Sequence, residues 1–352
     1  MSNDSKDRGS FRREALGQSA RAAVKAAWWT GIGAAARMIT RPTKDRPKGF
    51  NPSGPAPASG TVMRSWLSAF QKDAADVAAG LYPAMGDGPG DAGGAIREAL
   101  DFLADAREVN ARRRRRGGVE ARTEAPAASA AYPNYYRQNF HYQSGGWFTE
   151  ESARRYDAQV EALFSGTAAA MRRRGLSLLA RAWRAKDTRG ARVLDLACGS
   201  GGFLGDLKAA FPRAEVMGVD LSAQYLVEAR RRSGVARLAQ ANAEKLPFAD
   251  ASLDAVTCVY LFHELPPKVR PVVAGEIARV LKPGGMFVLV DSVQPVDEPE
   301  LERLLEAFPA YFHEPYYGTY SKLDLAGLFG AAGLTLEAED KAFLTKAMRF
   351  RR

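Results

Sequence analysis

Short apolar runs alternate with amphipathic stretches throughout the second half of the chain. A short apolar run between turn signals predicts a buried strand, whereas apolar residues at helical spacing predict a helix. The runs predict strands near residues 192–197, 215–219, 236–240, 254–259, 285–291, 334–339 and 342–349. The intervening patterns predict helices near residues 202–211, 222–232, 266–281, 298–307 and 321–331. Five strand–helix units followed by two adjacent strands indicate an α/β fold: a seven-stranded, mostly parallel sheet with an antiparallel last strand.

The first third of the chain shows helical periodicity and no strand pattern. Met63, Trp66, Leu67 and Phe70 follow the i, i+3, i+4, i+7 spacing of an amphipathic helix. We expect helices over residues 16–40, 61–81 and 95–110, disorder over residues 1–15, a linker over 41–60, a loop over 81–94 and a flexible connection over 117–131. Residues 1–131 are therefore expected to form a helical, partly disordered and basic N-terminal region.

Aromatic residues crowd the segment from Tyr132 to Phe148. Two helices, expected over residues 150–164 and 167–183, connect this segment to the sheet. We expect residues 132–190 to form an aromatic lid and its helices, and residues 191–352 to form the domain over which that lid closes.

A glycine-rich turn follows the first predicted strand. The strand ends near Asp195, and Gly199-Ser200-Gly201 leads directly into a helix. Glycine allows a sharp turn and a close approach of a ligand to the backbone, so this corner is typical of nucleotide sites in open α/β sheets. Asp220 ends the second strand about 20 residues later, where an acid binds ribose hydroxyls in such sites. Leu204 stands where a dinucleotide fingerprint requires its third glycine, which disfavours an NAD enzyme.

The motifs VLDLACGSG, GVDLS, AEKLPF and LKPGG follow in that order within residues 190–291. Together they resemble the core of the class I S-adenosylmethionine-dependent methyltransferases, in particular the type 11-like branch that contains small-molecule enzymes. The resemblance implies a Rossmann-like domain, S-adenosyl-L-methionine as the cofactor, and methylation of oxygen or carbon on a small aromatic or apolar molecule. It implies that the cofactor-binding residues are Asp195, Ala197, Gly199, Ser200, Gly201, Asp220, Leu221, Asn242, Ala243 and Tyr260.

The same resemblance gives these residues roles. Asp195 and the glycine turn would face the methionine part of the cofactor, and Tyr260 would line it. Asp220 would bind the ribose, and Leu221 would flank the adenine. Asn242 and Ala243 would hold the adenine edge. Many members of the family carry an acid in place of Asn242, whose carbonyl oxygen still accepts a hydrogen bond from an amine. The alternative is that residues 240–248 form a plain loop.

All three histidines of the chain lie in aromatic segments: His141, His263 and His313. His263 follows the fourth strand, and a neutral imidazole accepts protons near pH 7, which makes it the first candidate for a catalytic base. We expect the three side chains to converge on one acceptor pocket as catalytic residues. The alternatives are that His263 caps the following helix and that the three histidines pack at separate places.

Composition adds few constraints. The net charge is +10, but residues 1–131 hold 21 Lys and Arg against 14 Asp and Glu, so the excess lies mostly in front of the sheet. The two cysteines, Cys198 and Cys258, are expected in buried strands, which suggests a reducing compartment and no disulfide. No C-x-x-C pair or histidine cluster predicts a metal site. With no apolar run long enough for a signal peptide or a transmembrane segment, we expect a cytoplasmic protein.

Two other functions stay open at this point. The run from Arg112 to Arg116 and the basic front suit an RNA or protein methyltransferase, although such a run is more often a solvated helix end, so we expect no nucleic-acid partner. A non-catalytic, cofactor-binding assembly partner has the same fold signature. The Trp28-Trp29 helix is expected to pack on the catalytic domain or on a second copy, which would make a homodimer through the N-terminal helices.

Overall fold

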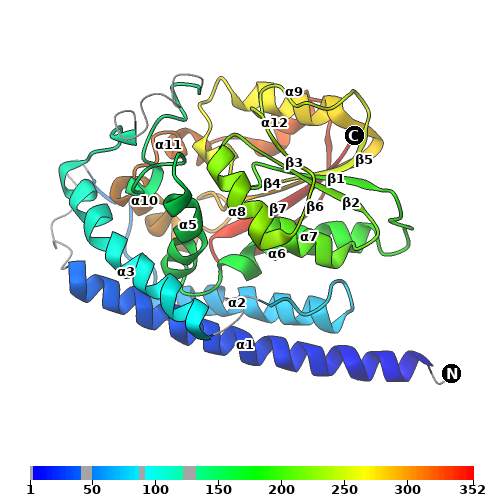
Figure 1. Cartoon of the computed structure of the whole chain (residues 1–352), viewed down its shortest axis with the longest axis horizontal. Coiled ribbons are helices and arrows are strands. Elements are labelled where there is room, and N and C mark those ends of the chain that lie inside the picture. The colour runs from blue at the N-terminus through cyan, green and yellow to red at the C-terminus, as the bar shows by residue number, and fades with distance from the viewer. Residues whose placement is uncertain (1–2, 41–49, 87–91, 122–131) are drawn as a thin grey trace.

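The structure is a computed structural model that describes residues 3–40, 50–86, 92–121 and 132–352. One seven-stranded sheet occupies its C-terminal half (Figure 1). Its strands are β1 (Arg192–Leu196), β2 (Glu215–Asp220), β3 (Leu238–Gln240), β4 (Leu253–Val259), β5 (Leu281–Ser292), β6 (Thr335–Ala342) and β7 (Thr345–Arg351). The strand order is β3-β2-β1-β4-β5-β7-β6. All pairs from β3 to β5 are parallel, and β7 is antiparallel to both of its neighbours, which confirms the predicted fold class.

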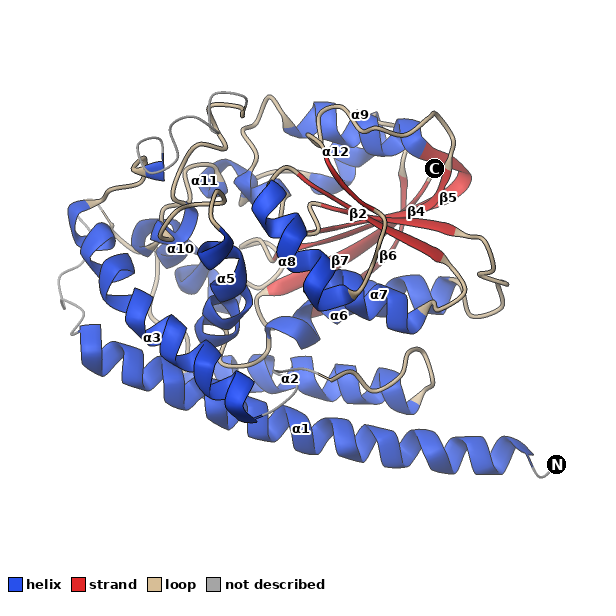
Figure 2. Cartoon of the chain, viewed as in Figure 1, coloured by secondary structure: helices blue, strands red, loops and turns tan. Residues whose placement is uncertain are grey.

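Helices cover both faces of this sheet (Figure 2). The described helices from residue 150 onward are α5 (Glu150–Leu163), α6 (Ala168–Ala182), α7 (Gly202–Ala210), α8 (Ala223–Ser233), α9 (Arg270–Val280), α10 (Glu302–Tyr311), α11 (Tyr317–Tyr320) and α12 (Leu325–Ala331). Short 3₁₀ turns are η2 (Phe140–Tyr142), η3 (Phe262–Glu264) and η4 (Pro299–Leu301). Leu194 and Leu196 belong to the core under α9 and α12, whereas Val193 belongs to the core under α6 and α7. This alternation follows from the two-residue period of a strand.

Several predicted boundaries move for local reasons. The helix expected over 266–281 begins at Arg270, because prolines at 266 and 267 lack the backbone donor and Pro271 suits the first helical turn. The helix expected over 321–331 is divided: α11 ends at Tyr320, and Asp324 caps α12 by accepting from the N–H of Gly327. Strand β5 begins at Leu281, four residues before the prediction, because Leu281 already pairs with Leu253.

The N-terminal helices α1 (Asn3–Thr40), α2 (Ser59–Ala78) and α3 (Ala92–Arg115) lie along one flank of the molecule (Figure 1). The expected disorder over residues 1–15 is wrong, since α1 is helical from Asn3 onward. The linker, loop and connection predictions fall partly on residues 41–49, 87–91 and 122–131, which lie outside the described residues. Trp29 of α1 is buried against Ala158 and Ala162 of α5, so this helix packs on the body of the chain.

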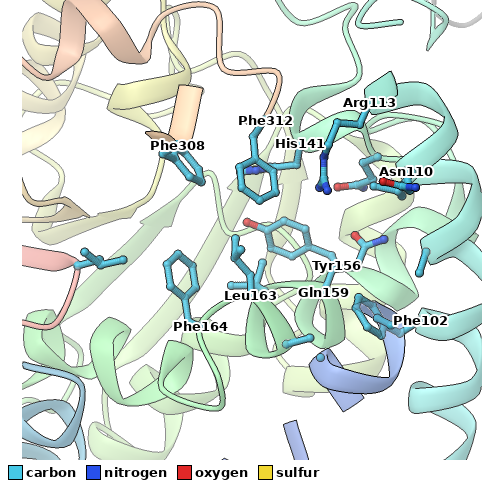
Figure 3. A pocket seen from close by; sticks show the side chains of 18 of the residues that line it. Phe102, Asn110, Arg113, His141, Tyr156, Gln159, Leu163, Phe164, Phe308 and Phe312 are labelled. Atoms are coloured by element: carbon cyan, nitrogen blue, oxygen red, sulfur yellow. The ribbon is translucent and has the colours of Figure 1, made fainter. Parts of the chain in front are cut away.

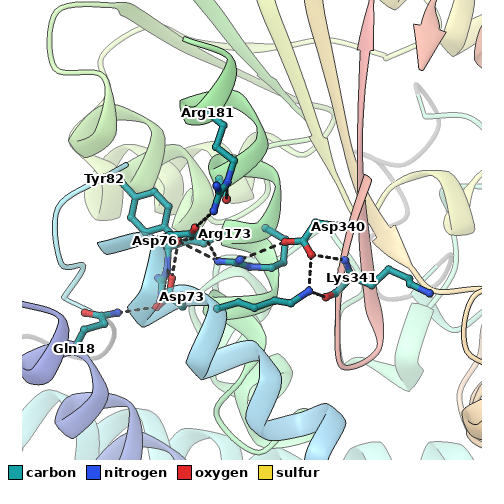
Figure 4. Close-up of polar contacts among 11 residues, drawn as sticks. Gln18, Asp73, Asp76, Tyr82, Arg173, Arg181, Asp340 and Lys341 are labelled. Carbon is teal, nitrogen blue, oxygen red and sulfur yellow. Dashed lines mark hydrogen bonds and ion pairs between the residues drawn. The ribbon is translucent and has the colours of Figure 1, made fainter. Parts of the chain in front are cut away.

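Buried ion pairs attach α2 to α6 (Figure 4). The guanidinium of Arg173 donates from Nε and Nη2 to the two carboxylate oxygens of Asp73, at 2.7 and 2.8 Å. Arg174 donates to Asp76 at 2.7 Å, and all four side chains are at most 2% exposed. Helix α2 is therefore part of the buried structure rather than a loosely attached extension. In the described part of the chain, no helix combines the length and apolar character that crossing a bilayer demands.

Candidate functional site

The turn after β1 adopts left-handed backbone conformations at alternate residues. Ala197, Gly199 and Gly201 have φ angles of 57°, 55° and 83°. Such angles suit glycine and are unusual for alanine, so the turn is tightly constrained. Gly201 is the N-cap of α7, and a Cβ atom there would stand 2.7 Å from the Cα of Ala229. The turn therefore presents the N-terminus of α7 to the carboxyl edge of the sheet and also lets α7 approach α8.

Asp195 lies at the end of β1 with its carboxyl group buried. The hydroxyl of Thr257 on β4 donates to its Oδ1 at 2.7 Å. Burial raises the pKa of Asp195 to about 7, because it disfavours the charged form. The group is therefore half-ionised near neutral pH and responds to any cation that binds beside it.

Asp220 ends β2 and closes the other side of the turn. Its two carboxylate oxygens accept from the backbone N–H groups of Gly199 and Ser222, at 2.9 and 2.8 Å. Burial raises the pKa of Asp220, while these backbone donors oppose the shift. These two bonds fix the orientation of the carboxylate.

The loop after β3 is held by its own side chains. Asn242 donates from Nδ2 to Glu244 at 3.1 Å, and its Oδ1 accepts from the N–H of Glu244. The hydroxyl of Tyr135 donates to the same glutamate at 2.7 Å, which ties the aromatic segment to this loop.

These strand ends surround a pocket at the carboxyl edge of the sheet, named here the sheet-edge pocket. Nine of the ten residues that the family resemblance assigns to the cofactor line it: Asp195, Ala197, Gly199, Ser200, Asp220, Leu221, Asn242, Ala243 and Tyr260. Gly201 does not line it, since its open side faces α8. The aromatic segment supplies Tyr135, Tyr136, Phe140 and Trp147 to the opposite wall.

Asp157 on α5 is a residue of this site that the sequence reasoning missed. It accepts from the hydroxyl of Ser200 and pairs with Arg172 at 2.9 Å. Although burial opposes its charge, Arg232 and Arg172 hold the pKa of Asp157 well below its usual range. Its position within an ordinary amphipathic helix gives no sequence signal that it reaches the glycine turn.

His263 lies in η3, directly after the loop that follows β4. Its Nδ1 atom is 2.6 Å from Oδ1 of Asp291 at the end of β5, and because a carboxylate only accepts, the imidazole donates. The other oxygen of Asp291 accepts from the N–H of Phe262. Burial opposes charge on the ring, but the Asp291 carboxylate outweighs it and raises the pKa of His263 to about 9. Asp291 was not predicted, although it ends a strand at the same edge as Asp195 and Asp220.

A second cavity of about 280 Å³ adjoins the sheet-edge pocket and is named here the helical cavity. The two share Tyr156, Tyr260 and Glu264. Figure 3 shows aromatic and aliphatic side chains from several helices facing this space. Its walls come from α1, α3, α5 and α10 and include Gly33, Ala36, Phe102, Val109, Val160, Leu163, Phe164, Leu304, Leu305, Phe308 and Phe312. The N-terminal helices therefore form part of a cavity beside the sheet edge.

The structure brings two of the three histidines to the helical cavity. His141 and His263 line it, and His313 does not, because its Nε2 atom meets the side-chain oxygen of Gln138 at 2.8 Å. Burial lowers the pKa of His141 to about 3, so this ring is neutral. The structure therefore places His141 and His263 at one cavity, and the predicted convergence does not include His313.

Two glutamates accompany His141: Glu314 is buried and Glu264 is half-buried. Glu314 stands 3.2 Å from Nδ1 of His141, and Glu264 stands 3.9 Å from Nε2, measured to a carboxylate oxygen in each case. Burial raises the pKa of both glutamates. The sequence reasoning missed this group because its members lie in three segments far apart in the chain.

The arginine run at the C-terminal end of α3 is a solvated helix end only in part, since Arg114, Arg115 and Arg116 are exposed and the first two arginines are not. Arg112 is buried and donates to Glu120 and to the carbonyl oxygen of Tyr142. Arg113 lines the helical cavity with its guanidinium 4.9 Å from the ring centre of Phe312. Both residues are thus part of the interior. Cys258 lies in buried β4 as expected, whereas Cys198 is buried in the turn after β1 rather than in a strand.

Known proteins resemble the part of the chain that builds the sheet. A family model described as a methyltransferase domain matches residues 193–285. A fatty-acid O-methyltransferase of Mycolicibacterium smegmatis is 40% identical over 125 residues, which are 35% of this chain and 45% of that protein. A demethylmenaquinone methyltransferase of Beutenbergia cavernae is 33% identical over 202 residues, covering 57% of this chain and 73% of that protein. The chain thus spans less than half the length of the first relative.

A solved structure adds a further likeness. The magnesium protoporphyrin IX methyltransferase of Synechocystis, solved with bound S-adenosylhomocysteine, has a TM-score of 0.41 and 16% sequence identity, over 51% of this chain and 83% of that one.

Proposed function

This chain belongs to the class I S-adenosylmethionine-dependent methyltransferases, and we propose that it methylates a largely apolar small molecule that carries an acidic hydroxyl or carboxyl group. The observation that carries this proposal is the helical cavity, which adjoins the sheet-edge pocket and has the His263–Asp291 pair at their border. The acceptors named by the two relatives, a fatty acid and a demethylmenaquinone, are both largely apolar molecules.

The residues of the sheet-edge pocket suit S-adenosyl-L-methionine. When bound, this cofactor supplies an electrophilic methyl group on a sulfonium. We propose that Asp195, with Ala197, Gly199 and Ser200, holds the amino-acid end, where a buried carboxylate offers a partner to an ammonium group. Asp220 would hold the ribose hydroxyls, because its carboxylate is already oriented by two backbone donors.

The remaining predicted residues would hold the two ends of the adenosyl group. Leu221 would flank the adenine, and Asn242 with Ala243 would hold its edge. Tyr260 would line the methionine part, since it borders both the sheet-edge pocket and the helical cavity. Asp157 and Arg172 would support this site indirectly by fixing Ser200 in the glycine turn.

The His263–Asp291 pair gives the acceptor side its chemistry. With its pKa at about 9, the ring carries a proton on both nitrogens near neutral pH: Asp291 fixes Nδ1, and Nε2 would donate to the acceptor's oxygen and favour its ionised form. An ionised oxygen is a stronger nucleophile than its neutral form. The same arrangement serves transfer to oxygen or to a carbon atom activated by a neighbouring phenolate.

The apolar walls of the helical cavity select the body of the acceptor. Aromatic side chains such as Phe102, Phe308 and Phe312 face the cavity, and apolar burial is the main source of affinity for such molecules. The walls also keep water away from the transferred methyl group. A small-molecule acceptor fits this cavity, whereas a nucleic-acid strand would need an open, basic groove.

Transfer of labelled methyl from S-adenosylmethionine to paired acceptors tests the proposal. The panel contains long-chain fatty acids and naphthols, each with a neutral analogue of equal length, namely the primary alcohol or the methyl ether. We expect transfer to the acidic members only. His263→Gln and Asp291→Asn should each lower kcat by about 10²-fold, because an acceptor oxygen that is no longer held in place loses its alignment with the methyl group. Asp187→Asn, on the exposed surface, is the matched control.

Two results would overturn the proposal. One is a wild-type protein that binds S-adenosylhomocysteine but methylates no acidic acceptor of the panel, or methylates the neutral analogues equally well. The other is full turnover in both the His263 and the Asp291 variants, which would remove the pair from the reaction.

A further inference from the structure

We propose that His141, Glu264 and Glu314 bind a divalent metal ion at the border between the helical cavity and the sheet-edge pocket. The three residues come from the aromatic segment, from η3 and from the loop before α11. His141 lines the helical cavity, and Glu264 lines both spaces, so an ion held by them would be reachable from each side.

The ligand atoms are already gathered. One atom from each side chain lies within 4.8 Å of the other two. Glu314 lies 3.2 Å from Nδ1 of His141 and Glu264 lies 3.9 Å from Nε2, and only one of these two nitrogens would bind the ion. Ligands at about 2.0–2.2 Å from a common ion stand up to about 4.4 Å apart, so small side-chain adjustments complete the geometry.

Polar atoms of this cluster lack partners. Within the described residues, neither carboxylate oxygen of Glu314 has a hydrogen-bond donor, and neither does Nδ1 of His141 have a partner in hydrogen-bonding geometry. The side chain of Glu314 is 0% exposed, so bulk water does not reach it. A buried carboxylate is costly unless it is paired, protonated or coordinates a cation, and the unpartnered atoms of Glu314 face the ring of His141.

The donor set indicates the class of ion. One imidazole nitrogen and two carboxylate groups suit Mn²⁺, Fe²⁺ or Zn²⁺. Three protein ligands leave positions open for water or a substrate atom, which is the pattern of reactive rather than structural sites. Magnesium prefers oxygen ligands and several retained waters, so it fits this cluster less well.

Such an ion would act on the acceptor. An anionic oxygen bound to it would be held at the border of the two spaces, beside Tyr260 and His263. This role rests on the proposed function, because it assumes an acceptor with an acidic oxygen. The metal site itself does not depend on that assumption, since its three ligands are defined without any acceptor.

Binding of Mn²⁺ to the full-length, chelator-treated protein is the direct test. Electron paramagnetic resonance of free Mn²⁺ gives both stoichiometry and affinity without any substrate or cofactor. We expect one site per chain, and at least tenfold weaker binding in His141→Gln and Glu314→Gln, because even residues that only support a ligand contribute that much. His313→Gln is the matched control, since this ring is adjacent in sequence to Glu314 but bonds to Gln138 outside the cluster.

The outcomes separate this proposal from the methyltransferase proposal. Circular dichroism first confirms that each variant is folded, and binding of S-adenosylhomocysteine confirms that the sheet-edge pocket is intact. A wild-type protein that binds no Mn²⁺ or Zn²⁺ at millimolar concentration refutes the metal site, as does equal affinity in wild type, His141→Gln and Glu314→Gln. Methyl transfer by a protein that binds no metal would support the proposed function and refute the metal site. Metal binding without any methyl transfer would support the metal site and not the proposed function.

Discussion

Arg173 on α6 provides a test of whether α2 belongs to the folded core. Its guanidinium forms two hydrogen bonds with Asp73 of α2, and both side chains are at most 2% exposed. In Arg173→Met, the Asp73 carboxylate loses these two hydrogen bonds from a cation, whereas the neutral donors Gln18, at 2.9 Å, and Tyr82, at 3.0 Å, remain. Leaving one charge of a buried pair without its partner costs about 3–5 kcal/mol.

Arg181→Met, further along α6, is the matched variant. Arg181 also pairs from α6 to an aspartate of α2, Asp76, but its side chain is 57% exposed. Exposed pairs contribute roughly 0–1 kcal/mol, so Arg181→Met should change stability very little. The difference between the two variants should therefore be about 3 kcal/mol, which corresponds to a melting temperature lower by roughly 6 °C if 1 kcal/mol shifts it by about 2 °C.

Thermal unfolding followed by circular dichroism measures both variants, and the double variant Asp73→Leu with Arg173→Met completes the comparison. Replacing both charges by apolar groups removes the unpaired carboxylate, so the double variant should be more stable than Arg173→Met alone. The reasoning fails if Arg173→Met and Arg181→Met melt within 1 °C of each other, or if the double variant is the least stable of the three.

Two further predictions concern the sheet-edge pocket. Because burial raises the pKa of Asp195 to about 7, and because only the ionised form attracts the cofactor's ammonium group, affinity for S-adenosylhomocysteine should rise roughly tenfold between pH 6 and pH 8. Calorimetry should show this rise in wild type and a flat profile in Asp195→Asn, and equal profiles would contradict the assignment. Gly201→Ala should lower the free energy of unfolding by about 2 kcal/mol more than Gly199→Ala, because both have positive φ but only at Gly201 would a Cβ meet the backbone of Ala229. Denaturant unfolding measures this difference. Equal losses of unfolding free energy in the two variants would show that α8 moves to accommodate the added methyl group at no cost.

The parts of the site that follow directly from strand ends were predictable. Asp195 and Asp220 end apolar runs, and parallel strands bring their carboxyl ends to one edge, so the sheet alone places them together. Asp291 also lies at the carboxyl end of a parallel strand, so its position at this edge was predictable in the same way. Nothing comparable marks Asp157 or Glu314, because their roles depend on how α5 and the loop before α11 pack.

The N-terminal helices show a different limit. The apolar spacing of residues 61–81 predicted a helix correctly, yet periodicity shows only that a face is apolar and not what it packs against. The first residues of α1 are rich in charge and lack an apolar face, so pattern reasoning expected disorder where the helix begins at Asn3. Asp73 and Arg173 are polar in sequence and buried in the structure, because each satisfies the other. Pairing of this kind is invisible until the two helices are placed.

The family resemblance covers most of the residues that line the sheet-edge pocket but few of those that line the helical cavity. The family match covers residues 193–285, and these residues supply the turn, the strand ends and the loop of the sheet-edge pocket. The helical cavity takes most of its wall from α1, α3, α5 and α10, which lie outside that match. An acceptor that differs between enzymes demands a wall that differs too, and helices added around a constant sheet supply one without disturbing the cofactor's contacts. Under the proposed function, residues such as Phe102, Arg113 and Phe312 select the acceptor through the shape and polarity that they give the cavity.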